Sequence, residues 1–97
     1  MELKQHYNYV AFYADGFKIG RTTSPHRRMR QLHAMAFDTG RPVSRAVALH
    51  TETHIRRSLR KFAIAGTLEY FEGSLEQGLM VVELTTQVQD AMEDAGL

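Results

Sequence analysis

The sequence predicts an α+β fold with a small, mainly antiparallel sheet of three strands flanked by three helices. The dipeptide Asp15-Gly16 separates two runs of alternating apolar residues, a pattern typical of a β-hairpin. Ser24-Pro25 matches a helix start, because Ser can accept a hydrogen bond from an early backbone N–H and Pro fits the first turn. Ser74, with Gln77 three residues later, forms a capping box, which indicates the start of a further helix.

The predicted hairpin joins strands at about residues 7–14 and 17–21. A two-residue loop at Asp15-Gly16 places Tyr13 opposite Lys18 and Phe12 opposite Ile19. Side chains alternate along a strand, so one face is expected to be apolar and the other to carry phenols and an amine. The apolar face comprises Val10, Phe12, Phe17 and Ile19, and the other face comprises Tyr9, Tyr13 and Lys18.

The elements between the hairpin and the last helix follow from apolar spacing and turn residues. The first helix is expected to run to about Ala36, followed by a loop at residues 38–42. Residues 43–50 fit a third strand. A second helix is expected from a Thr51 or Thr53 cap to about Ala65, with Gly66 terminating it.

The last helix is predicted at about residues 75–94, after a short connecting segment or strand at residues 67–71. Its apolar surface is wider than one sheet contact requires. Part of that surface would cover the sheet, and the remainder could contact a second copy or a protein partner.

Length and composition limit the classes of protein. A chain of 97 residues can bury one modest core, so residues 1–97 are expected to form a single domain. No apolar run reaches the roughly 18 residues of a membrane span, and no secretory signal is evident, so no membrane partner is expected. The absence of cysteine excludes disulfides and thiolate metal sites and makes a reducing cytoplasm the expected compartment.

The net charge of +1 hides a strong asymmetry along the chain. Residues 1–66 contain all 12 Lys and Arg against four acids, whereas residues 67–97 contain seven acids and no Lys or Arg. A basic body with an acidic C-terminal segment indicates a polyanion-binding face. The alternative is that these charges simply solvate the helices.

Three motifs carry a resemblance to a known family. These are Lys18-Ile19-Gly20-Arg21-Thr22, the helix opener SPHRRMRQL at residues 24–32, and Glu69-Tyr70-Phe71. Together they resemble the GIY-YIG endonuclease superfamily, in the phage and bacterial branch whose second motif reads KIGRT, over about residues 7–72. The resemblance implies a metal-dependent DNA endonuclease in which a hairpin tyrosine assists the attacking water, a helix arginine stabilises the phosphate and one glutamate holds a divalent ion.

The resemblance also assigns the phosphate and metal residues. Counting from Gly20, the helix arginine falls on Arg28, whose guanidinium can bond two phosphate oxygens at once. The metal-binding glutamate falls on Glu69, and a single hard carboxylate suits Mg²⁺ or Mn²⁺. His50 and His54, four residues apart, offer a rival Zn²⁺ site without an evident third ligand.

The tyrosine motifs depart from the family pattern. Lys18 occupies the place of the second tyrosine, and the first tyrosine position falls near Ala11, between Tyr9 and Tyr13. The expected pairing of Tyr13 with Lys18 favours Tyr13 as the substitute, with Tyr9 as the second choice.

The resemblance further implies DNA as the partner and suggests a phage origin, with action in the host cell. The remaining cations are expected to contact the nucleic-acid backbone without reading sequence. These are Arg21, Arg27, Arg30, Arg56, Arg57, Arg60 and Lys61. The alternative is a degenerate domain that binds DNA or a protein partner without cleavage.

Overall fold

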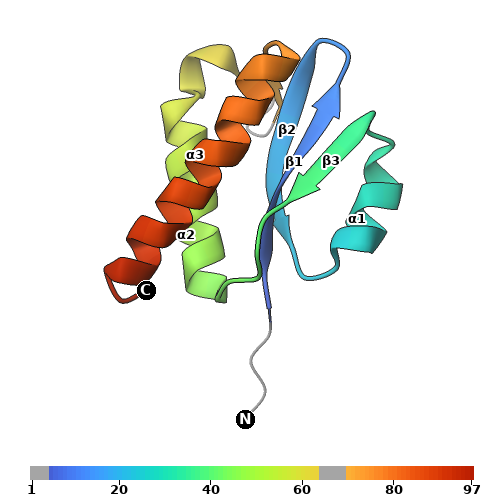
Figure 1. Ribbon diagram of the computed structural model, residues 1–97. Helices are drawn as coiled ribbons and strands as arrows, with labels where there is room; N and C mark the ends of the chain where they lie inside the picture. Colours follow the sequence, from blue (N-terminus) through green and yellow to red (C-terminus); the bar gives the residue numbers. More distant parts are fainter. Residues whose placement is uncertain (1–4, 64–69) are drawn as a thin grey trace.

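The computed structural model describes residues 5–63 and 70–97 and contains one four-stranded antiparallel sheet (Figure 1). The strand order is β3-β1-β2-β4. The strands are β1 (Tyr7–Tyr13), β2 (Gly16–Thr22), β3 (Ala36–Thr39) and β4 (Tyr70–Glu72). The helices are α1 (Pro25–Leu32), α2 (Arg45–Ser58) and α3 (Leu75–Asp94), with a short 3-10 helix, η1 (Arg60–Phe62), after α2.

The helices form two layers on opposite faces of the sheet. α2 and α3 lie side by side on one face, and α1 lies on the other (Figure 1). The prediction of an α+β fold with three helices is therefore confirmed. The predicted number of strands is wrong, because the described residues form four.

The main core lies between the sheet and the α2–α3 layer. The sheet contributes the four apolar side chains expected on one face of the hairpin, and Phe71 of β4 stacks on Phe17 with ring centroids 5.8 Å apart. The helices contribute Ile55 of α2 and Val81 and Val88 of α3. The alternation of the two strands thus identified the core face correctly.

The turn of the hairpin lies one residue earlier than predicted, which shifts every cross-strand partner by two residues. Tyr13 pairs with Gly16 and Ala11 pairs with Lys18, so the turn residues are Ala14 and Asp15. Neither turn residue has a positive φ, which excludes a type I′ turn, the type that an Asp-Gly loop favours. Gly16 instead begins β2 and lies against the backbone of Phe71 in β4, where a Cβ atom would overlap the carbonyl.

The chain between α1 and α2 departs most from the prediction. α1 ends at Leu32, because His33 adopts the left-handed conformation at φ 51°. β3 then pairs with β1 at positions where the prediction placed the end of a helix and a loop. A strand this short carries too few residues for its alternation to be recognised.

The predicted strand at residues 43–50 is wrong. Val43 makes only an isolated bridge with His6, and α2 begins two residues later. The Ser44 hydroxyl caps α2 by accepting a hydrogen bond from the Val47 N–H at 3.2 Å. Val47 and Ala48 are buried on the packed side of this helix. The apolar residues that suggested a strand are therefore core residues of α2.

The predicted capping box at the start of α3 is confirmed. The Gln77 N–H donates to Ser74 Oγ at 3.2 Å, and the Ser74 N–H donates to Gln77 Oε1 at 2.7 Å. The helix has the expected bounds, Leu75 to Asp94. None of the helices in the described part of the chain combines the length and apolarity that a membrane crossing requires.

Candidate functional site

A polar hollow of about 200 Å³ lies where β2 leads into α1. Its walls come from the end of β2, the connection and the first two turns of α1, and they are Thr22, Thr23, Ser24, Arg27, Arg28 and Gln31. The Ser24 hydroxyl makes no capping hydrogen bond, and the first turn contains no acid. The early N–H groups of a helix carry partial positive charge, and two guanidinium groups add to it here. The hollow is therefore suited to an anion such as a phosphate group.

Tyr9 of β1 pairs with Gly20 of β2, two residues before Thr22 in the wall of this hollow. Its ring crosses directly over Gly20, where a Cβ atom would lie 2.8 Å from ring atom Cε2. The ring also stacks on Phe37 of β3, with centroids 5.1 Å apart, and only 4% of Tyr9 is exposed. Position 20, in the predicted KIGRT motif, thus requires glycine, because any side chain there would collide with the Tyr9 ring.

Tyr13 lies at the other end of β1. Its hydroxyl donates a hydrogen bond to the Leu32 carbonyl, at the C-terminal end of α1, at 3.0 Å. Burial raises the pKa of Tyr13, and the neighbouring Tyr70 raises it further, while the charge of Lys18 acts in the opposite direction. A phenol with a raised pKa is a poor proton acceptor near neutral pH.

Lys18 packs against the ring of Tyr70. Only 9% of Lys18 is exposed, and its Nζ lies 5.0 Å from the centre of the Tyr70 ring, an arrangement that stabilises the ammonium through the ring electrons. Its cross-strand partner is Ala11. The pairing that favoured Tyr13 as the substitute tyrosine is therefore wrong.

The two tyrosines are separated along the length of α1. Four residues of strand cover about 13 Å, and an eight-residue helix covers about 12 Å. Tyr9 lies over Gly20, two residues before Thr22 in the wall of the hollow, whereas Tyr13 contacts the opposite end of α1. Along the sheet, Tyr9 therefore lies toward the start of α1 and Tyr13 toward its end.

A second polar cluster lies on the α2–α3 face of the sheet. Glu52 of α2 is 8% exposed and forms ion pairs with Arg21 of β2 at 3.5 Å and with Arg56 of α2 at 3.2 Å. A carboxylate this buried requires such partners, because an isolated charge is costly to remove from water. The prediction did not include Glu52, although its spacing of four residues before Arg56 is a signal for an ion pair once the helix is recognised.

The cations predicted to contact nucleic acid do not share one surface. Arg27 and Arg30 are exposed on α1. Arg57 of α2 and Arg60 and Lys61 of η1 are exposed on the layer across the sheet. The structure brings together only the α1 group with the hollow.

The structure describes only some of the predicted metal ligands. Glu69 lies outside the described residues. His50 and His54 are both exposed on α2, and no three His, Asp or Glu side chains converge anywhere in residues 5–63 and 70–97. The described residues thus provide no ready set of ligands for a divalent ion.

Comparison with known families identifies the chain. The family model of the T5orf172 domain matches residues 5–86, so the chain belongs to the T5orf172 domain family. No curated protein and no solved structure gives a significant match. The match covers the whole sheet, α1, α2 and more than half of α3.

Proposed function

We propose that this T5orf172 domain is a nuclease-like domain that acts on DNA, and more specifically an endonuclease of the GIY-YIG type that hydrolyses phosphodiester bonds. The observation that supports it best is the hollow at the start of α1, where Arg27 and Arg28 flank the positive end of a helix. Membership in a phage-associated, nuclease-like family supports the same reading.

Arg28 would bind the phosphate group in this hollow. Its guanidinium can donate two parallel hydrogen bonds to non-bridging oxygens, and so stabilise the charge that builds up on them during attack. The N–H groups at the start of α1 and the side chain of Arg27 add positive potential at the same place. Arg30, exposed on the same helix, would contact the backbone of the nucleic acid nearby.

Tyr9 is the tyrosine that we propose to orient the attacking water. It lies over Gly20, next to the strand end that forms the hollow, whereas Tyr13 donates its O–H to the Leu32 carbonyl. Tyr13 and Lys18 would then support the sheet beneath α1, without contacting the phosphate.

The metal requirement depends on a residue that the structure does not describe. Among the described acids, Glu52 is buried, but Arg21 and Arg56 already occupy its carboxylate oxygens. A Mg²⁺ or Mn²⁺ ion at Glu52 would have to displace a guanidinium, so this carboxylate does not fit the ion as it stands. Binding of the ion by Glu69 remains part of the proposal.

A second function is favoured by the state of the tyrosines. Tyr13 is committed to a hydrogen bond, and Tyr9 is almost fully buried against Phe37. A domain with an arginine-lined phosphate hollow in which neither Tyr9 nor Tyr13 can reach the phosphate would bind DNA without cutting it. A non-cleaving DNA-binding domain is therefore the alternative.

The test is incubation of the purified protein with supercoiled plasmid in Mg²⁺, in Mn²⁺ and in EDTA. We expect nicking that requires the metal and falls by about 100-fold or more in Arg28→Ala, the loss typical of a removed transition-state contact. The matched control is Arg45→Ala, which removes an exposed arginine at the start of α2, across the sheet.

The other outcomes are equally informative. Intact plasmid under every condition, with retarded migration that Arg28→Ala weakens, would replace the nuclease proposal with the DNA-binding alternative. Neither cutting nor retardation would contradict both. Equal losses in Arg28→Ala and Arg45→Ala would contradict the assignment of the hollow as the phosphate site.

A further inference from the structure

An apolar groove of about 440 Å³ lies between η1 and α3, on the side of the sheet away from α1. Phe17 of β2 and Val81 of α3, both buried, contribute to its lining. Two large apolar side chains of its walls face solvent: Phe62 of η1 is 44% exposed and Met80 of α3 is 67% exposed. Contiguous exposed apolar surface beside a hollow is a common mark of a protein contact.

The two walls of the groove carry opposite charges. Glu72 of β4 and Glu83 of α3 line the groove and are exposed, and we call them its acidic wall. Arg60 and Lys61 do not line the groove but are exposed on η1, next to the lining residue Phe62, and we call this flank the basic wall. Within residues 5–63 and 70–97, none of these four charges forms an ion pair. The groove therefore offers an acidic wall and a basic wall that are both available to a partner.

We propose that this groove is the interface of a homodimer, with a second copy of this chain as its occupant. An interface related by a two-fold axis uses the same surface on both copies, so that surface must complement itself. This one does, because it contains a hollow together with protruding apolar side chains, and both signs of charge. A basic peptide would complement only the acidic wall, and an acidic peptide only the basic wall.

In the dimer, Phe62 and Met80 of each copy pack into the groove of the other, and the acidic wall of each copy faces the basic wall of its partner. Apolar anchors at the centre and charges at the rim are the usual arrangement of such contacts. The hollow at α1 lies across the sheet and stays open. The inference goes beyond the proposed function and does not depend on it.

Sedimentation velocity of the full chain over a range of concentrations tests the proposal. We expect a reversible dimer, and Met80→Lys should raise its dissociation constant about tenfold or more, because it places a charge among apolar side chains. Met35→Lys is the matched control: Met35 is 76% exposed and lies between α1 and β3, away from the groove. Circular dichroism verifies that both variants are folded.

Charge reversal tests the orientation of the two walls. Arg60→Glu with Lys61→Glu should weaken the dimer, because like charges then face each other across the interface. Adding Glu72→Lys and Glu83→Lys to that variant should restore it, because the walls again have opposite signs.

Two results would overturn the proposal. One is a wild-type chain that stays monomeric up to ~0.1 mM at low salt, where charge pairs are least screened; the groove would then await another occupant. The other is a dimer that Met35→Lys weakens as much as Met80→Lys does. Loss of plasmid nicking with an intact dimer would concern the proposed function alone.

Discussion

Tyr9 and Tyr13, two of the three tyrosines of β1, show how single contacts separate similar side chains. Tyr9 and Tyr13 lie on the same face, four residues apart, yet one ring crosses a glycine and the other donates to the end of a helix. The first lies over Gly20, two residues before the wall of the proposed phosphate hollow, and the second joins β1 to α1. A turn one residue earlier than predicted changes the cross-strand partner of Tyr13 from Lys18 to Gly16, although Lys18 stays near enough for its charge to act on the pKa of Tyr13.

At this scale we predict that Tyr13 makes stability depend on alkaline pH. Burial raises its pKa in the folded state, whereas in the unfolded chain the phenol has its ordinary pKa of about 10. The contribution to stability is therefore complete below pH ~10 and is lost as the pH rises through the folded-state pKa. The free energy of unfolding of Tyr13→Phe should fall less steeply above pH ~10 than that of the wild type.

Urea unfolding monitored by circular dichroism at several pH values provides the measurement. Below pH ~10, Tyr13→Phe should also be less stable by about 1 kcal/mol, because the Leu32 carbonyl loses its donor. Curves that run parallel above pH ~10 would show that Tyr13 does not titrate differently in the two states.

At the scale of elements, close contact between α3 and the sheet depends on one small residue. Gly78 is buried in the first turns of α3, against the ring of Phe12. A Cβ atom at Gly78 would lie 2.9 Å from Cδ1 of that ring and nearer still to Cε1. Glycine lowers helix stability in general, so its presence here reflects packing.

We predict that Gly78→Ala destabilises the fold by about 1–3 kcal/mol, the typical cost of overpacking, even though alanine is the better helix former. In a Phe12→Leu background the same substitution should cost less, because the smaller side chain leaves room for the methyl group. Urea unfolding of the four proteins gives a double-mutant cycle. Additive effects would mean that the Phe12 ring is not what excludes a side chain at Gly78.

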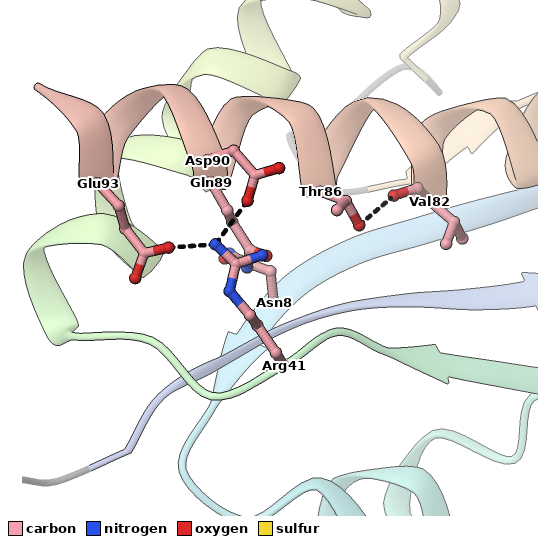
Figure 2. Close-up of polar contacts among 7 residues, drawn as sticks. All are labelled: Asn8, Arg41, Val82, Thr86, Gln89, Asp90 and Glu93. Atoms are coloured by element: carbon pink, nitrogen blue, oxygen red, sulfur yellow. Dashed lines mark hydrogen bonds and ion pairs between the residues drawn. The ribbon is translucent and has the colours of Figure 1, made fainter.

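At the scale of the whole molecule, a buried polar network joins three elements. Gln89 of α3 donates to Asn8 Oδ1 of β1 at 2.8 Å, and both side chains are drawn in Figure 2. Asn8 Nδ2 donates to the Ala48 carbonyl of α2 at 3.0 Å. Gln89 is fully buried. Just outside it, Arg41 reaches α3 through ion pairs with Asp90, at 2.8 Å, and Glu93. The network links positions 40 and 81 residues apart in the sequence.

We predict that Gln89→Ala lowers the free energy of unfolding by about 2–4 kcal/mol. The substitution leaves Asn8 Oδ1 buried without its hydrogen-bond donor and opens a small cavity. Thr86→Ala, one turn earlier on α3, is the control: Thr86 is exposed and its hydroxyl only bonds to the Val82 carbonyl of its own helix at 3.4 Å (Figure 2). It should cost less than about 0.5 kcal/mol. Equal thermal shifts for the two variants would contradict a structural role for the network.

The sequence by itself determined the features that depend on neighbouring residues. Alternation identified the core face of the hairpin, because each strand residue takes the face opposite to its neighbour. The Ser74–Gln77 capping box located the start of α3, because both of its hydrogen bonds join residues three apart. The family resemblance singled out Arg28 just after a helix start, and the structure finds Arg27 and Arg28 in the lining of the polar hollow there.

Only the tertiary structure decided what depends on distant residues. The hairpin register follows from the close approach of Gly16 to β4, and β3 exists because β1 offers an edge to it. Residues 43–50 form a helix start because that conformation packs Val47 and Ala48. The burial of Glu52 between Arg21 and Arg56 required β2 and α2 to meet. Contacts between residues far apart in the sequence produce no regular spacing along it. These contacts decided how the cations are distributed between the two faces of the sheet.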